Sequence, residues 1–508
     1  MSAEADLGRD GSVGRERAVV AAVAGAPLVA FAAFPMPIPA LPAISAELGV
    51  GTAELQLLVS GYALGLGTLL VLAGVLADRS GAVRVWVVAM SAFGVCSLGC
   101  AVAPAVPALI AGRIGQGVAG AGLLAASLAL VATAVPAPRR PGAAALWGAA
   151  IGAGLAGGPL VGGVSLEFGQ WRPVFAGLGL LALLAAGAGW LLLPAVVPAG
   201  GSAARLEPFG PLTLAGGLAA LILAVNWAGA GDWTAPRVLG GLLVAAALLG
   251  CFALVQRRAP EPMLDLAVLR NRQYLGGLVA GLALALSALS MMVVIGPYLQ
   301  VVVGASALVL ALWFLPFSGL AFAVALLAAR LSPRLSLRAR LVAGLGAAAA
   351  GMAALLPIAP GWTWPALVPG MALTGVGVGL ANPALAIAAV GSVPPERSGM
   401  AAGVANTARQ MGNALGIVVL AMAMQVAAIG AARAAGAGVD AAVLIRIAGG
   451  DLPGARALSP DPELVTRLYA AAQTSGVRVA LLVAIATCLA GLLATAWLMR
   501  PDRRPDRS

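Results

Sequence analysis

Histidine and lysine are absent from this sequence, and all 30 basic residues are arginine. Because imidazole is the side chain that ordinarily titrates near neutral pH, its absence excludes histidine-based metal binding, general-base catalysis and proton relay. Charge of either sign is also scarce, at 10% of residues, where a soluble domain carries roughly 25%. A chain with so few charges cannot cover its surface in water, so a bilayer must be its solvent.

Apolar residues are abundant instead. They make up 61% of the chain and give a mean hydropathy of +1.00. A helix needs roughly 20 consecutive apolar residues to cross the hydrocarbon core, so the apolar runs predict an all-α polytopic membrane protein with about 14 transmembrane helices. The predicted spans cover 19–41, 55–77, 85–103, 108–135, 143–164, 173–194, 209–227, 237–256, 275–299, 307–329, 341–358, 365–389, 400–428 and 477–499.

The spans group into two bundles with an insertion between them. Arginines concentrate in the loops on one side of the predicted membrane, and the positive-inside rule then puts both termini in the cytoplasm. The long segment 429–476 lies outside, as a partly ordered cap with no recognisable catalytic motif. The predicted parts are a cytoplasmic N-tail at 1–18, an N-terminal six-helix bundle at 19–194, a cytoplasmic linker at 195–208, a two-helix insertion at 209–256, a cytoplasmic loop at 257–274, a C-terminal six-helix bundle at 275–499 and a cytoplasmic C-tail at 500–508.

The basic charge and the cysteines have simple interpretations. The net charge of +11 does not predict a nucleic-acid partner, because the arginines lie in short loops where they set orientation. Cys96 and Cys100 are one helical turn apart, but no other Cys or His is near them in the sequence, so packing is favoured over metal binding. The expected partners are a small-molecule substrate and the lipid bilayer, with the chain as a monomer.

Carboxylates are missing at membrane depth. None of the 19 Asp and Glu residues falls in the middle of a predicted span; Asp78 lies at the inner end of the second span, and Glu47 and Glu54 lie in the first outer loop. Proton-coupled transport needs a group that titrates within the pathway, usually a carboxylate or a histidine. The residues alone therefore provide no proton site deep in the membrane.

Two arginines do lie at membrane depth, Arg113 and Arg409. A charge there costs roughly 2.5–3.5 kcal/mol, so such residues usually face a cavity or a partner, although Arg113 is close enough to an interface to snorkel. An electropositive cavity favours an anionic or zwitterionic substrate. Arg409 shares one stripe of its helix with amide side chains, which either bind substrate or bond across helices. The predicted substrate cavity contains Arg113, Gln116, Asn382, Asn406, Arg409 and Gln410, and the stripe also includes Asn413.

Proline and glycine mark two irregular spans. The first span ends in PMPIPALP, and each proline removes a backbone donor and frees a carbonyl. Broken backbone at membrane depth is tolerated where it lines a cavity or is buried in protein, so we expect the outer half of this span to be unwound and to line the cavity. In GAGLAGGPLVGG, from 152 to 163, small residues at turn spacing predict close helix contact, and Gly158–Pro159 favours a kink.

Several motifs lie at particular positions along the spans: GVLADRSGAVR at 74–84, RIGQGVAG at 113–120, WRPVF at 171–175 and PYLQ at 297–300. Together with the glycine cluster and NTARQMGNALG, they resemble the major facilitator superfamily and, within it, the branch of fourteen-span drug:proton antiporters, over residues 19–499. The resemblance implies an inner gate at Gly74, Asp78, Arg79, Gly81 and Arg84, and an antiporter motif at Gly154, Gly158, Pro159, Gly162 and Gly163.

The resemblance also implies a function. Two six-helix bundles of the major facilitator fold would rock around a central cavity in the plasma membrane and export drugs, antibiotics or related small molecules by alternating access, powered by the proton gradient and with no bound cofactor. The branch usually carries an Asp in its first span, and alignment on the ALP of 40–42 puts Ala33 there. That difference keeps open a proton-independent exporter, or a narrow exporter of an endogenous metabolite such as an anion.

Two other classes of function are remote. An intramembrane enzyme needs a nucleophile, a carboxylate pair or a metal cluster at depth, and the predicted spans display none of these groups. A non-transporting membrane sensor or scaffold has no need of gate and antiporter motifs. We therefore expect a transporter and not an enzyme.

Overall fold

The computed structural model describes residues 2–136, 139–193, 209–228, 234–258, 266–331, 335–392, 398–435, 439–448 and 450–500. Every regular element within these ranges is a helix, which confirms the predicted all-α fold. The first half comprises α1 (Ser2–Ala33), η1 (Ile38–Ala40), α2 (Leu41–Leu48), α3 (Thr52–Ser80), α4 (Ala82–Ala101), α5 (Val106–Ala134), α6 (Arg140–Glu167) and α7 (Arg172–Leu192).

Two helices follow, α8 (Phe209–Ala228) and α9 (Pro236–Arg258). The second half comprises η3 (Leu266–Arg270), α10 (Arg272–Leu284), η4 (Ala285–Leu289), α11 (Ser290–Val301), α12 (Ala307–Trp313), α13 (Leu315–Leu331), α14 (Leu337–Ala354), α15 (Trp364–Val390), α16 (Ser398–Ala435), α17 (Ala441–Ala448), α18 (Leu452–Ala457) and α19 (Pro462–Leu498).

The described part of the chain contains 12 candidate membrane spans by length and composition. Two shorter apolar helices, Leu57–Leu70 within α3 and Leu212–Val225 within α8, coincide with the other predicted spans. Large apolar side chains such as Leu184, Trp190 and Leu191 are exposed along α7, as expected of a helix face that contacts lipid. The chain is a multi-pass membrane protein, and the number of about 14 spans stays a prediction.

The two halves repeat one packing pattern. In the first half α3 packs along α5 and α1 along α6; in the second half α13 packs along α15, and α10 with η4 packs along α16. Helices α8 and α9 pack on each other, and α8 also contacts α3. This is the predicted arrangement of two bundles with a two-helix insertion.

Glycines bring the backbones of paired helices into direct contact. On α6, one glycine per turn faces a carbonyl oxygen of the first span, where a Cβ atom would overlap that oxygen: Gly154 faces Leu28, Gly158 faces Ala32 and Gly162 faces Met36. The same contact recurs in the second half, where Gly412 and Gly416 of α16 face the carbonyls of Leu282 and Leu286. The antiporter motif of α6 is thus one copy of a packing device that both halves use, and α6 continues as a helix through Pro159.

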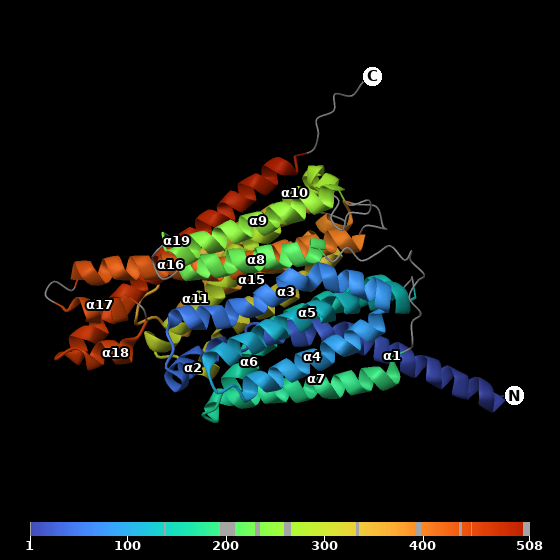
Figure 1. Cartoon of the computed structure of the whole chain (residues 1–508), viewed down its shortest axis with the longest axis horizontal. Helices are drawn as coiled ribbons and strands as arrows, with labels where there is room; N and C mark the ends of the chain where they lie inside the picture. The colour runs from blue at the N-terminus through green and yellow to red at the C-terminus, as the bar shows by residue number, and fades with distance from the viewer. Residues whose placement is uncertain are drawn as a thin grey trace, which may run out of the picture.

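The two halves meet at the end of the molecule opposite the chain termini, called the distal end below. Gln300 Nε2 donates to the Pro39 carbonyl at 2.8 Å, and Ser306 Oγ donates to Glu167 Oε1 at 3.4 Å. Helix α12 also packs against α6. Toward the termini the helices of the two halves spread apart (Figure 1). The structure is therefore closed between the halves at the distal end.

One arginine ties the distal loops of the first half together, which explains the WRPVF motif. Arg172 forms an ion pair with Glu47 at 2.8 Å, and its Nη1 donates to the carbonyls of Ala101 at 3.1 Å and Ala103 at 2.9 Å. Trp171 Nε1 donates to the second Glu47 oxygen at 2.6 Å. Glu47 is thus held by the loops at this end, away from the middle of the first span.

The segment 429–476 is more regular than predicted. Helix α16 extends to Ala435, beyond the predicted end of its span at 428, and α19 begins at Pro462, before the predicted start at 477. With α17 and α18 these extensions bury a separate small core that includes Ile447, Val465 and Leu468. The described part of this segment is therefore a packed helical cap with a buried apolar core of its own.

Gly162→Ala tests the glycine contact. The added methyl group meets the Met36 carbonyl, so we expect destabilisation of about 1–3 kcal/mol, as for other overpacked contacts, measured by thermal or denaturant unfolding in detergent. Gly157→Ala on the same helix is the matched control, because its Cβ meets nothing within 4 Å, and it should leave the unfolding temperature unchanged or slightly raised, since alanine favours a helix over glycine. Equal effects from both variants would contradict this interpretation.

Candidate functional site

The first span breaks where prolines interrupt it. Helix α1 ends at Ala33, a turn covers residues 34–37, and a 3-10 segment leads into α2. Pro37 has no N–H to donate to the Ala33 carbonyl, as a helix would require, and Arg113 Nη1 donates to that oxygen instead, at 2.9 Å. The prediction of an unwound stretch is confirmed, although the backbone becomes helical again from Leu41.

Arg113 lies inside the first half. Its side chain is fully buried, and it also donates to the carbonyls of Phe34 at 3.3 Å and Leu58 at 3.3 Å. Gln116 Oε1 accepts from Arg113 at 3.0 Å, and Gln116 Nε2 donates to a serine hydroxyl at 2.7 Å. The guanidinium carbon lies 4.7 Å from the centroid of the Tyr62 ring. Arg113 therefore binds broken backbone, and neither it nor Gln116 lines the cavity described next.

A central cavity lies between the two halves. Its interior volume is about 10 Å³, room for roughly one water molecule, so its two walls nearly touch in this state. The first half contributes Phe31, Phe34, Tyr62, Ile151 and Leu155, and the second half contributes Leu289, Asn382, Arg409, Gln410 and Asn413.

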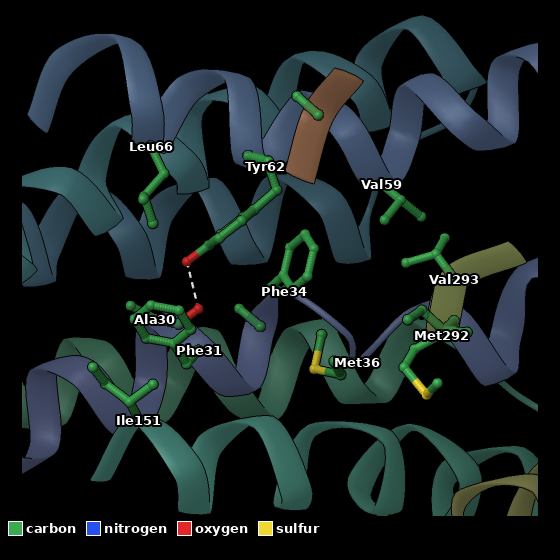
Figure 2. Packing of buried hydrophobic residues seen from close by; sticks show 14 of the residues in the cluster. Ala30, Phe31, Phe34, Met36, Val59, Tyr62, Leu66, Ile151, Met292 and Val293 are labelled. Carbon is green, nitrogen blue, oxygen red and sulfur yellow. Dashed lines mark hydrogen bonds between the residues drawn. The ribbon is translucent and has the colours of Figure 1, made fainter. Parts of the chain in front are cut away.

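The wall from the first half is aromatic and aliphatic. The rings of Phe34 and Tyr62 lie 6.1 Å apart at 43°, and Phe31 and Ile151 complete the apolar surface (Figure 2). The Tyr62 hydroxyl donates to the Ala30 carbonyl at 2.5 Å, as Figure 2 shows. That bond fixes the Tyr62 ring of α3 to the last turn of α1, directly before the break in the first span.

The wall from the second half carries the polar groups. Arg409 Nη2 donates to Asn406 Oδ1 at 2.8 Å, and Asn413 Nδ2 donates to Gln410 Oε1 at 3.2 Å. Asn406 is not in the lining and acts through Arg409. The Oδ1 atoms of Asn382 and Asn413 are buried and have no hydrogen-bond partner among the described residues. Buried polar atoms are normally bonded, so this wall has acceptor capacity available to a ligand.

One feature of this wall had no signal in the sequence. Residues Ala285–Leu289 form a π-helical turn between α10 and α11, and Leu289 lines the cavity. Ser290 Oγ donates to the Asn413 carbonyl at 3.1 Å and so joins this turn to α16. π-Helical turns occur frequently at functional sites, and here the last residue of the turn lines the cavity.

The predicted inner gate lies at the end opposite the distal end. Gly81 joins α3 to α4 with φ of 93°, a backbone conformation that favours glycine. Gly74 is half-buried and Arg84 is exposed. The side chains of Asp78 and Arg79 lie outside the described residues, so the inner gate stays a prediction.

The described residues contain no group of three or more His, Cys, Asp or Glu that could hold a metal ion. Cys100 is buried, and Gly112 of α5 packs closely against its sulfur, as Gly115 does against Cys96. These two thiols therefore fill space between α4 and α5.

The model of the Major Facilitator Superfamily matches residues 23–417. The chain belongs to the major facilitator superfamily. It is therefore a membrane transporter, since the members of this superfamily are transporters and not enzymes. The motifs implied this fold: two halves, each packed through glycine contacts, with a cavity between them.

Among the relatives of this transporter, the puromycin resistance protein pur8 of Streptomyces alboniger is 37% identical over 390 residues, which cover 75% of this chain and 76% of that one. The methylenomycin A resistance protein of Streptomyces coelicolor is 31% identical, covering 75% of this chain and 80% of that protein. The multidrug resistance protein Stp of Mycobacterium tuberculosis is 30% identical, covering 75% and 71%.

Solved structures support the fold. A bacterial homologue of the human lysosomal transporter Spinster, in an inward-facing and unoccupied conformation, superposes with a TM-score of 0.67 and 16% identity, covering 95% of this chain and 97% of that one. The occupied inward-facing form of the same transporter gives 0.65.

The structure brings together part of the predicted site and separates the rest. Asn382, Arg409 and Gln410 line the cavity, while Arg113 and Gln116 lie behind its wall and Asn406 supports Arg409. The apolar wall was not predicted, because Phe31 and Ile151 resemble any other apolar residue in a span. The proline-interrupted stretch that begins at Phe34 was the sequence feature that could have indicated this wall.

Arg113→Lys separates the roles of the two deep arginines. A lysine keeps the charge but cannot bond several carbonyls in the same planar arrangement, so we expect a loss of about 1.5–3 kcal/mol for each charge-assisted bond that is not replaced. Arg409→Lys loses a single bond, to Asn406, and should lower the unfolding temperature less. A larger effect at Arg409 than at Arg113 would contradict this assignment.

Proposed function

We propose that this transporter exports antibiotics or related small molecules across a plasma membrane by alternating access, as a monomer with no bound cofactor. The relatives named for resistance to puromycin, methylenomycin A and multiple drugs support export as the direction of transport. The observation that carries the proposal is the cavity between the halves, with one wall from each. Movement of the halves apart at either end would open it to that side.

The distribution of arginine supports an orientation with both termini in the cytoplasm. The distal end then faces outward, and its contacts through Gln300 and Glu167 close the outer side. In this orientation the structure corresponds to a state that is closed on the outer side of the membrane. The helical cap from α16 to α19 would stand outside the membrane.

Coupling has two candidate forms. The resemblance implies exchange against protons, which requires a titrating group in the pathway. The cavity lining has no carboxylate and no histidine, and Ala33 is fully buried where the branch carries an Asp. This observation favours the second candidate, export that does not depend on protons.

Accumulation of drugs in cells tests the proposal. Cells that lack their own major exporters and express this chain should retain less puromycin, ethidium or another member of an antibiotic and dye panel than cells with empty vector. Arg409→Gln should remove the difference at equal membrane abundance, because it removes the charge from the cavity. Retention equal to that of empty-vector cells across the whole panel would overturn the export proposal.

A crosslink tests alternating access at the distal end. Ser306 and Glu167 are exposed and in contact across the two halves, so cysteines at both positions should be joined by a short cleavable bismaleimide in a background without the native cysteines. We expect export to fall at least ten-fold on crosslinking and to return on cleavage. Each single-cysteine variant is the control, and retained export in the joined protein would contradict the opening of this end during transport.

A further inference from the structure

The cavity contains a cation with no anionic partner. Arg409 is the charged residue of the lining, and the ion pairs among the described residues do not include it. The complete sequence offers no substitute, because none of its 19 Asp and Glu residues lies in the middle of a predicted span. A charge at membrane depth is costly unless it is paired or solvated, and an anion bound in the cavity would supply the counter-charge that the described residues do not give Arg409.

The two walls define the rest of the ligand. Phe31, Phe34 and Tyr62 line one side of the cavity, and aromatic rings pack favourably on one another in offset or edge-to-face arrangements. The Arg409 guanidinium carbon lies 5.7 Å from the centroid of the Phe31 ring, at the boundary between the walls. A flat ring between the halves would contact the aromatic wall while a charged substituent at its edge meets Arg409.

The amides add a second requirement. The unpartnered Oδ1 atoms of Asn382 and Asn413 accept hydrogen bonds and cannot donate them. A ligand that also carries hydroxyl or N–H groups would satisfy them. The lining therefore fits an aromatic ring system with one acidic substituent and further donors.

We propose that the cavity carries an aromatic monoanion, with an ionised carboxylate, sulfonate or enol bound at Arg409, and that the membrane potential drives its export without a proton. The inference rests on the proposed export function and adds the substrate class and the driving force. One anion leaves per cycle and no other ion need cross.

The charge of the site explains how the potential acts. With the anion bound, the charge of Arg409 is neutralised. The loaded cavity therefore switches from one side of the membrane to the other without moving net charge. The empty cavity carries one positive charge, and an inside-negative potential favours its return to the inside. Since one elementary charge across 100 mV corresponds to about 2.3 kcal/mol, the potential supports a concentration ratio of roughly 50-fold per 100 mV.

Purified full-length protein in liposomes tests both parts. The probe is 6-hydroxynaphthalene-2-sulfonate, whose sulfonate stays ionised and whose hydroxyl can donate a hydrogen bond, and 6-hydroxynaphthalene-2-sulfonamide is its neutral match. A potassium gradient with valinomycin sets the potential at equal pH on both sides. We expect the sulfonate to accumulate in vesicles with a positive lumen, in a ratio that rises with the potential toward about 50-fold per 100 mV. A pH gradient at the same clamped potential should change uptake less than two-fold.

Variants assign the effect to the cavity. Arg409→Gln should reduce sulfonate uptake at least ten-fold, and Arg409→Lys should retain part of it because the charge remains. Arg433→Gln is the matched control, since Arg433 lies on the same helix and is exposed, and it should transport as the unchanged protein does. Elution as a single peak in size exclusion confirms that each variant is folded.

The outcomes separate this inference from the proposed function. Transport of puromycin or ethidium without transport of the sulfonate overturns the anionic substrate and leaves export intact. Sulfonate uptake that requires a pH gradient overturns the potential as the driving force. Movement of no probe by folded protein overturns both, and equal uptake by Arg409→Gln overturns the assignment of the anion to Arg409.

Discussion

Arg113 compensates for a broken backbone, and the arrangement of the first half depends on that compensation. Four prolines in the first span leave carbonyls without helical donors, and lipid offers no water to replace them. The guanidinium binds the carbonyls of Ala33 and Phe34 from the neighbouring α5. A single cation therefore permits the first span to change direction at membrane depth.

That change of direction has consequences on both sides of the span. Phe31 and Phe34 face the cavity, while the Met36 carbonyl contacts Gly162 and the Pro39 carbonyl accepts from Gln300 of the other half. The same unwound stretch thus contributes to the cavity wall, to the packing of α6 and to closure at the distal end. A conformational change at this stretch is coupled to all three, because each contact uses its backbone.

The division of the cavity between the halves links structure to transport. The apolar wall moves with the first half and the polar wall with the second, so separation of the halves separates Arg409 from the aromatic rings. The small volume of about 10 Å³ in this state means that a ligand must hold the walls apart. Contacts made by direct backbone packing, through the glycines of α6 and α16, keep each half intact during such a movement.

From the sequence alone it follows that the protein lies in a bilayer, that its fold is all-helical with two halves, and that its first span is broken. These features follow from local composition: apolar runs, proline and glycine spacing, and the absence of carboxylates from the spans. The sequence also identified Arg113 and Arg409 as residues that need a partner. It did not distinguish their roles, and it missed Phe31, Ile151 and the π-helical turn at Ala285–Leu289. Only the tertiary structure decided that Arg113 binds backbone inside one half while Arg409 faces the space between halves. The physical reason is that the partner of a deep charge is set by which helices pack beside it, and those neighbours are distant in the sequence.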